Sequence, residues 1–510
     1  MAEPKLRQRI GSLPGWAKLA LLAALTVLFV LLSKWLVLIL LIVMGLWAIL
    51  LLAILGVLVP GWIPRLSPGP RWALSVVWEA LLVGLLYAGW KTDLGLWPIF
   101  LLAVGGMLLL VLTKLRGMIV PFLAVLTALI AGAVVIMATD PAALQALAKD
   151  GIGEALKVAF SNMLLAYGAL YVGALGNPLD ILNGIGQWLS GAGIQPLVAS
   201  LRGPSDSLVQ SVPYIFAGLA VALGFRAGLF NIGVEGQIGI GWMAAVVVGF
   251  SLPGLPAVIL LPLAMVVGAV AGGLWAAIAG FLKARTGAHE VITTIMLNYV
   301  SYRLMAWLLC GPLEATQGTC RTQDIAAGAF LPRFLPHPVT LHWGFFLALL
   351  AALAVGWYLF RTTWGFELRA VGANPSAARY GGMKVGRTFI VTMFLSGCLA
   401  GLAGMSQGLG ITHNIALGFQ SGYGFDSIAL ALLGKSHPAG VVAASILFGV
   451  LRAGASRMQS IAGVPTEIVQ IVQAMVIIFI AAPAIIQTLF RLRKAKQEEA
   501  AVVLTRGWGA

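Results

Sequence analysis

Apolar runs long enough to cross a lipid bilayer recur along this chain of 510 residues. Hydrophobic residues make up 60% of the sequence and charged residues 10%, and the mean hydropathy is +0.99. A soluble domain cannot cover so much apolar surface, whereas a helix of about 20 apolar residues crosses a bilayer with its backbone groups paired. The sequence therefore predicts an all-α polytopic integral membrane protein.

One apolar run is broken in an unusual way at 218–237, GLAVALGFRAGLFNIGVEGQ. Its polar residues alternate with glycines: Arg226, Asn231, Glu235 and Gln237, with Gly224, Gly228, Gly233 and Gly236. Non-helical backbone at membrane depth must be buried in protein or line a cavity, and discontinuous helices often form the binding sites of transporters. The segment indicates a broken helix that faces a pathway. A short surface loop between two spans is the alternative.

The distribution of Lys and Arg orients the chain, since cytoplasmic loops carry an excess of both. The loop 361–387 carries five such residues against one Glu, so we expect it inside, together with Lys283 and both termini. The polar stretch 311–340 then lies outside, where Cys310 and Cys320 could pair. The formal charge of +15 fits this orientation. No basic patch is interleaved with aromatic residues, so no nucleic-acid partner is expected.

Composition divides the chain into four parts. We expect extra N-terminal transmembrane helices (about four spans) at 1–117, a first core span and an extracytoplasmic or re-entrant segment at 118–209, the core at 210–490, and a cytoplasmic tail at 491–510. Keeping 361–387 inside requires 139–209 to start and finish outside. The segment 156–200 is therefore interfacial or re-entrant, or it crosses an even number of times.

Motifs for enzyme chemistry are missing from the sequence. Gly434-Lys435-Ser436 ends like a phosphate-binding loop, but the glycine needed upstream is Ala429. The five histidines have no metal-ligand spacing. We expect no catalytic residue and no metal site.

Five stretches, in order, resemble a known family. They are FRAGLFNIGVEGQ at 225–237, KARTGAHEVITTIMLNYV at 283–300, RTTWGFELRAVGANPSAARYGGMKVGR at 361–387, LSGCLAGLAG at 395–404 and GFDSIALALLGKSHPAG at 424–440. Together they resemble the permease subunits of bacterial ABC importers for nucleosides and related simple sugars. His289 stands where Asn is usual. The resemblance covers about 205–490 and leaves 1–117 outside.

The resemblance implies a permease core of about eight spans in the bacterial plasma membrane, among membrane lipids. It implies three protein partners: an ATP-binding cassette subunit, a second permease subunit (identical or different) and an extracytoplasmic substrate-binding lipoprotein. This chain would bind no cofactor, because ATP would be bound by the partner. A nucleoside is the favoured cargo, since the first two motifs occur together.

Polar residues of the break and of the following helix are the candidates for the substrate path: Phe230, Asn231, Glu235, Gln237 and Asn298. A neutral polar cargo needs hydrogen-bonding groups without strong net charge, and Asn and Gln supply both donors and acceptors. Phe230 is available to stack on the cargo or to close the path.

The loop 361–387 is the candidate for docking the ATPase. Asn374-Pro375 reads as a helix start and Gly381-Gly382 as its end, so a short surface helix is expected. The docking residues would be Arg369, Gly372, Asn374, Pro375, Ala377, Ala378 and Gly381. The alternative is a solvated loop that only orients the chain.

An ion-coupled secondary transporter of a small polar solute is the rival function. Such proteins couple through intramembrane carboxylates, and Glu235 and Asp426 are the two candidates, both beside glycine-rich breaks.

The predicted orientation can be tested by labelling single cysteines in a background free of native cysteines. A membrane-impermeant maleimide should label the Gln317→Cys variant in intact cells and leave the Arg369→Cys variant unlabelled until the cells are opened. The reverse pattern would invert the orientation.

Overall fold

The computed structural model describes residues 119–191, 193–420, 422–481 and 485. The expected N-terminal bundle at 1–117 and tail at 491–510 lie outside these residues. The described part is almost entirely helical, and its only β-type pairings are two isolated bridges. The all-α prediction is confirmed.

The helices follow one another along the chain from α5 to α20. They are α5 (Ile119–Thr139), α6 (Pro141–Lys149), α7 (Ile152–Leu175), α8 (Pro178–Leu189), α9 (Gln195–Ser200), α10 (Arg202–Arg226), α11 (Val234–Ser251), α12 (Ala257–Thr286), α13 (Glu290–Leu309), the 3₁₀ turn η3 (Ala327–Ala329), α14 (Gly344–Arg361), α15 (Thr363–Ala373), α16 (Pro375–Tyr380), α17 (Val385–Gln407), the π-helical turn η4 (Gly408–Thr412), α18 (Tyr423–Leu433), α19 (Pro438–Ala462) and α20 (Thr466–Ala481).

Seven helical stretches of the described part are long and apolar enough to cross a membrane, or eight if the bent pair of α5 and α6 counts as one span. This agrees with the expected core of about eight spans. Helix α13 has 20 residues but is not among the seven. Helix α18 has 11 residues, so it is about 16 Å long and cannot cross a bilayer by itself.

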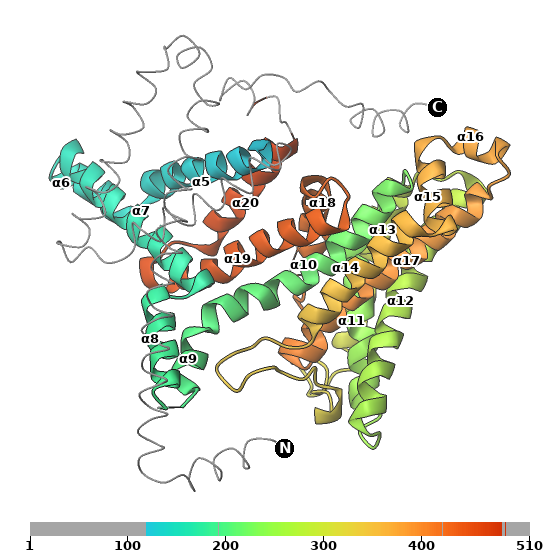
Figure 1. Cartoon of the computed structure of the whole chain (residues 1–510), viewed down its shortest axis with the longest axis horizontal. Coiled ribbons are helices and arrows are strands. Elements are labelled where there is room, and N and C mark those ends of the chain that lie inside the picture. Colours follow the sequence, from blue (N-terminus) through green and yellow to red (C-terminus); the bar gives the residue numbers. More distant parts are fainter. Residues whose placement is uncertain (1–118, 192, 421, 482–484, 486–510) are drawn as a thin grey trace, which may run out of the picture. The chain divides into compact units, whose positions relative to one another are not determined.

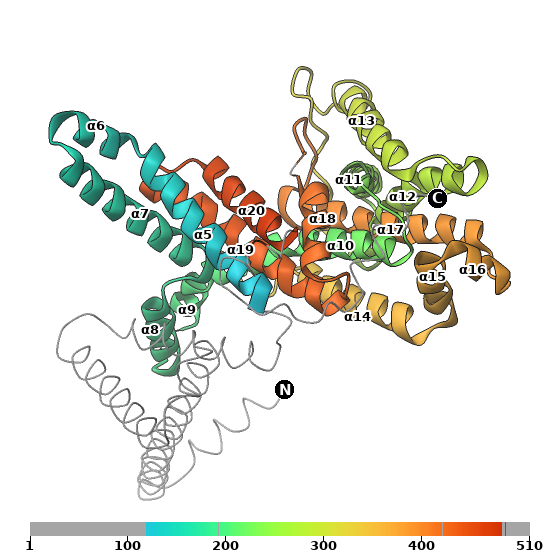
Figure 2. The same ribbon diagram turned by 90° about the horizontal axis from the view of Figure 1, so that it is seen from above.

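The segment 156–200 contains one helix of crossing length. Helix α7 has 24 residues, whereas α8 has 12 and is therefore about 18 Å long. Two crossings would need two helices of about 20 residues. Figure 2 shows α6 folded back along α7, and α7 packs on α19.

Helix α10 is the centre of the described part. Its residues 211–224 are buried on all sides, which a helix that is apolar all round requires. It packs against α14, α17, α18 and α19, and Figure 1 shows it running beside α19. Tyr214, Phe216 and Leu219 are among its largest fully buried side chains.

Glycines allow α11, α12 and α17 to pack closely. A Cβ atom on Gly272 of α12 would lie 2.5 Å from the carbonyl oxygen of Gly397 on α17, and one on Gly401 would collide with the carbonyl oxygen of Gly268. Gly241 of α11 faces Gly401 in the same way. Membrane helices associate through such small-residue contacts, because lipid gives no hydrophobic driving force between them.

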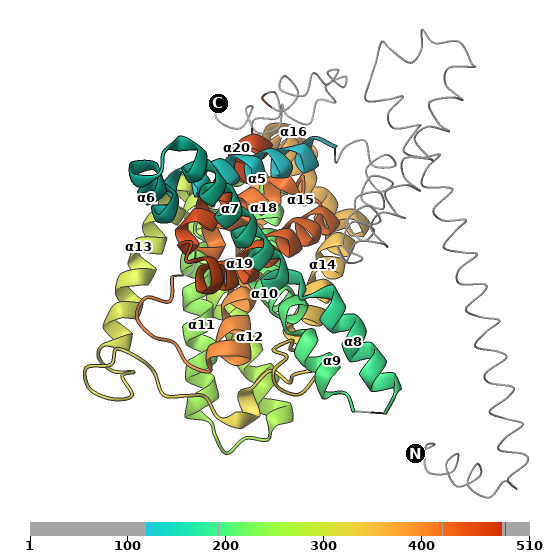
Figure 3. The same ribbon diagram turned by 90° about the vertical axis from the view of Figure 1, so that its left-hand side faces the viewer.

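At each of the two ends of the helical core, segments that are far apart in sequence come into contact. At one end, the turn after α10 contacts α15, and Lys283 of α12 pairs with Glu290 of α13 at 2.8 Å. At the other end, the loop 311–343 pairs with residues after α17. Figure 3 shows α13 at the outer side of α11, on which it packs.

Replacing Gly401 with Ala should destabilise the fold by about 1–3 kcal/mol, because a methyl group has no room beside the backbone of α12. The matched control is Gly168→Ala in α7, an exposed position where a Cβ atom meets nothing within 4 Å. That change should stabilise the helix by about 0.5–1 kcal/mol. Thermal unfolding of the detergent-solubilised protein measures both, and equal unfolding temperatures would contradict the close packing.

Candidate functional site

The predicted helix break is present between α10 and α11, and a pair of side-chain amides is hydrogen-bonded across it. Helix α10 ends at Arg226, Gly228 adopts a φ of 71°, and α11 begins at Val234. The Asn231 Nδ2 donates to the Gln237 Oε1 at 3.0 Å, and the Gln237 Nε2 donates back to the Asn231 Oδ1 at 3.0 Å. Both residues are buried, so each amide satisfies the other where water is absent.

Two further contacts anchor this amide pair. The Asn231 Nδ2 also donates to the hydroxyl of Ser396 on α17 at 2.9 Å, and that hydroxyl donates to the Ala220 carbonyl of α10 at 2.8 Å. The Asn231 Oδ1 accepts from the Gly233 backbone at 3.0 Å. The break is therefore tied to both neighbouring helices.

Asn298 of α13 fixes the start of α11. Its Oδ1 accepts from the Gly236 backbone N–H at 2.8 Å, and its Nδ2 donates to the Ile232 carbonyl at 2.9 Å. One side chain thus pairs two backbone groups that a broken helix leaves without intrahelical partners. Asn298 is 2% exposed, so it lies between the helices.

Glu235 connects the break to the short helix α18. Its carboxylate accepts hydrogen bonds from the backbone N–H groups of Gly422, at 3.1 Å, and of Gly424. These groups stand at the start of α18, where backbone donors are unpaired and negative charge is favoured. Gly424 is required here, because a Cβ atom would collide with the Glu235 backbone.

The structure thus brings the five predicted path residues together around one break. Four of them, Asn231, Glu235, Gln237 and Asn298, are buried and hydrogen-bonded within the chain. Phe230 is partly buried, and its ring lies 5.1 Å from that of Phe225, centroid to centroid. The four buried side chains hold the backbone of the break in place.

The predicted surface helix within 361–387 is present as α16. The Asn374 side chain accepts from the Ser376 and Ala377 backbone N–H groups, both at 3.0 Å, and Pro375 occupies the first turn. Gly381 forms the C-cap, as the Gly-Gly pair predicted. Helix α15 precedes it and is capped in the same way by Thr362.

Two of the predicted docking residues face the chain itself. A Cβ atom on Gly372 would collide with the Arg226 carbonyl and lie 2.8 Å from the carbonyl carbon of Ala227. Ala378 is 5% exposed. Arg369 is partly buried with its guanidinium 5.4 Å from the centre of the Phe360 ring. Asn374, Pro375, Ala377 and Gly381 are exposed, as is Tyr380, which is 98% exposed.

The sequence Gly434-Lys435-Ser436, which ends like a phosphate-binding loop, forms a turn that binds Arg226. The Arg226 Nε donates to the Ser436 carbonyl at 3.0 Å and its Nη2 to the Lys435 carbonyl at 3.3 Å. The turn after α18 is thereby fastened to the end of α10. Lys435 and Ser436 shape this turn, and both adopt positive φ values.

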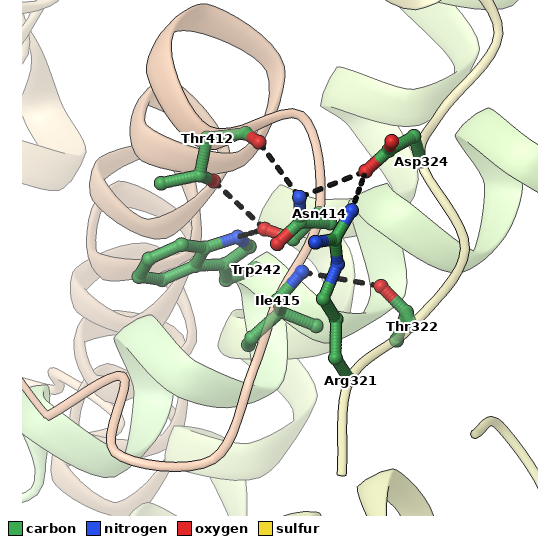
Figure 4. A network of polar contacts seen from close by, with 7 residues as sticks. All are labelled: Trp242, Arg321, Thr322, Asp324, Thr412, Asn414 and Ile415. Atoms are coloured by element: carbon green, nitrogen blue, oxygen red, sulfur yellow. Dashed lines mark hydrogen bonds and ion pairs between the residues drawn. The ribbon is translucent and has the colours of Figure 1, made fainter. Parts of the chain in front are cut away.

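The opposite end is closed by two paired loops (Figure 4). The Asn414 side chain donates to Asp324 at 2.8 Å, and this bond with the Arg321 contact lowers the pKa of Asp324. The Ile415 N–H donates to Thr322 at 3.1 Å, and the Trp242 indole donates to the Asn414 carbonyl at 3.2 Å. Cys310 and Cys320 form a disulfide within the first loop.

Sequence reasoning missed a polar cluster where α10, α18 and α19 meet. Besides Asp426 it contains Gln210, Tyr214, Tyr423 and Arg452. The available signal was Arg452, the single charged residue in the apolar run 439–456. No group of three or more potential metal ligands occurs among the described residues.

Comparison with known proteins identifies the family. Residues 203–481, more than half of the chain, match the family described as "Branched-chain amino acid transport system / permease component". The guanosine ABC transporter permease protein NupP of Bacillus subtilis is 45% identical over 57% of this chain and 84% of its own length. The nucleoside ABC transporter permease protein NupB of Lactococcus lactis is 36% identical, over 58% and 84%.

A third relative is the glucose ABC transporter permease protein TsgB13 of Haloferax volcanii, which is 37% identical over 56% of this chain and 77% of its own. No solved structure matches the chain. The family match covers the break, the loop with α15 and α16, and the paired loops of the opposite end. This chain is a multi-pass membrane protein that belongs to the family of ABC transporter permease components.

Proposed function

We propose that this chain forms the translocation path for nucleosides in an ATP-driven importer of the bacterial plasma membrane. The observation that carries the proposal is the 45% identity with a guanosine permease over 84% of that relative. A simple sugar is the second candidate cargo, because a glucose permease is 37% identical. Family membership favours this function over the ion-coupled alternative.

In this proposal the break at 227–233 belongs to the wall of the path. Asn231, Gln237 and Asn298 act as its scaffold, because their amide groups are used within the chain. Glu235 holds the start of α18 beside it. Phe230 lies in the break as a partly buried ring beside Phe225.

ATP is bound by a separate cassette subunit in this proposal, and this chain binds no cofactor. In the same proposal the loop with α15 and α16 faces that subunit on the cytoplasmic side. The cytoplasmic position of both termini is a separate part of the proposal and rests on the distribution of Lys and Arg. The Cys310–Cys320 disulfide supports an extracytoplasmic position for the opposite end, where a substrate-binding lipoprotein docks. A second permease subunit completes the path.

The docking surface we propose is the exposed side of α16. Gly372 and Ala378 pack on the chain itself, so they position this helix without offering contact area. Tyr380 projects fully from its last turn. An exposed aromatic side chain on a rigid element is the kind of anchor that dominates binding at protein interfaces.

The Tyr380→Ala variant should weaken binding of the ATPase subunit by about 2 kcal/mol or more, as expected for an aromatic anchor. Co-purification and titration of the two subunits in detergent measure the loss. The control is Trp307→Ala, which removes an aromatic side chain that is 63% exposed near the C-terminal end of α13. Equal affinity of the Tyr380 variant and the wild type would remove Tyr380 from the docking surface.

The cargo can be tested in proteoliposomes containing the chain, its ATPase and its lipoprotein. We expect ATP-dependent uptake of labelled guanosine that excess adenosine suppresses and excess glucose does not. A partner ATPase unable to hydrolyse ATP is the control. Uptake of glucose without uptake of guanosine would make the sugar the cargo.

A further inference from the structure

The polar cluster between α10, α18 and α19 joins side chains of all three helices by hydrogen bonds. The Tyr214 hydroxyl donates to the Asp426 Oδ2 at 2.8 Å and accepts from the Arg452 Nη1 at 2.9 Å. The Tyr423 hydroxyl donates to the Gln210 Oε1 at 2.8 Å. Tyr214 thus bridges a carboxylate and a guanidinium on two different helices.

The two tyrosine rings support Arg452. Their centroids lie 4.8 Å apart with the rings edge to face, and the Arg452 guanidinium stands 4.4 Å from the centre of the Tyr423 ring. Tyr214 and Tyr423 are 0% and 3% exposed. The cluster is therefore buried on its tyrosine side.

The other residues of the cluster form its less buried part. Gln210, Asp426 and Arg452 are partly buried, and Phe425, which precedes Asp426, is 49% exposed. Ionisable residues within membrane helices are costly, and they usually face a partner or a water-filled cavity. The Tyr214 hydroxyl contacts only the Oδ2 of Asp426. This hydrogen bond does not by itself explain why Asp426 is partly exposed.

Charge balance in the cluster suits a neutral molecule. Asp426 carries one negative charge and Arg452 one positive charge, while the Glu235 carboxylate nearby in α11 is occupied by the start of α18. Asp426 and Gln210 thus offer an acceptor and an amide, and Arg452 balances the charge of Asp426. A nucleoside presents ribose hydroxyls, which carboxylates bind as acceptors, and a flat base, which stacks on aromatic rings.

We propose that this less buried part of the cluster, together with Phe425, is a binding site for the nucleoside on its way through the permease. Asp426 accepts hydrogen bonds from the ribose hydroxyls, Gln210 contacts the polar edge of the cargo, and Phe425 stacks on the base. Tyr214 is a positioning residue that holds Asp426 and Arg452 in register. The inference rests on the proposed nucleoside function and adds the residues that touch the cargo.

The test compares two variants of the complete importer in proteoliposomes. Asp426→Asn keeps an acceptor for Tyr214 but weakens the bonds to the ribose, so uptake of labelled guanosine should fall about tenfold. Tyr214→Phe removes the bridge and leaves the carboxylate, so it should cost less. If the cluster only holds the helices together, Tyr214→Phe should reduce uptake more than Asp426→Asn does, because the hydrogen bonds of Tyr214 are then the only contribution of the cluster.

A second measurement addresses the ribose itself. The uptake by Asp426→Asn divided by the uptake by the wild type should be about 0.1 for guanosine and near 1 for 2′,3′-dideoxyguanosine. The dideoxy compound lacks the two ribose hydroxyls that Asp426 would bind. Taking the ratio cancels the preference of the lipoprotein. Thermal unfolding of each variant detects any loss of folding. Equal ratios for the two cargoes, or a larger loss in Tyr214→Phe, would overturn the site.

Failure of the inference differs from failure of the proposed function. If the wild-type importer carries guanosine and Asp426→Asn carries it at the same rate, only the site falls. If the wild type carries no nucleoside, the proposed function falls, and the ribose site falls with it.

Discussion

The fold depends on the need to pair every polar group of a helix that is interrupted between two apolar segments. Asn231 and Gln237 meet this need by binding each other, and Asn298 pairs the backbone at the start of α11. With these amides in place, the chain can stop one helix and start another while remaining buried. Removing any one of them would leave donors and acceptors unpaired in an apolar interior, which is strongly unfavourable.

Close packing of glycines complements this polar scaffold. Helices α11, α12 and α17 approach each other through Gly241, Gly272 and Gly401, so their backbones touch where larger residues would separate them. Ser396 stands on α17, the same helix as Gly401, and binds Asn231. The packing of α17 therefore sets the position of the break as well as that of α12.

Much of this arrangement could be predicted from sequence because its signals are local. Apolar length located the helices, and Asn374-Pro375 with Gly381-Gly382 located α16. The partners could not be predicted, since Glu235 binds Gly422 across 187 positions and nothing local marks that contact. Likewise, Gly372 reads as a small residue on a docking helix, whereas the structure places it against the turn after α10.

Helix α18 is held at both of its ends by residues that flank the break. Arg226, just before the break, binds the carbonyls at the far end of α18, and Glu235, just after it, binds the N–H groups at the near end. The short helix and the break are thus cross-linked at two separate points. The Arg226 carbonyl also lies against Gly372 of α15, where a Cβ atom would collide with it. One residue, Arg226, thus connects the α15–α16 end both to the far end of α18 and to the flank of the break.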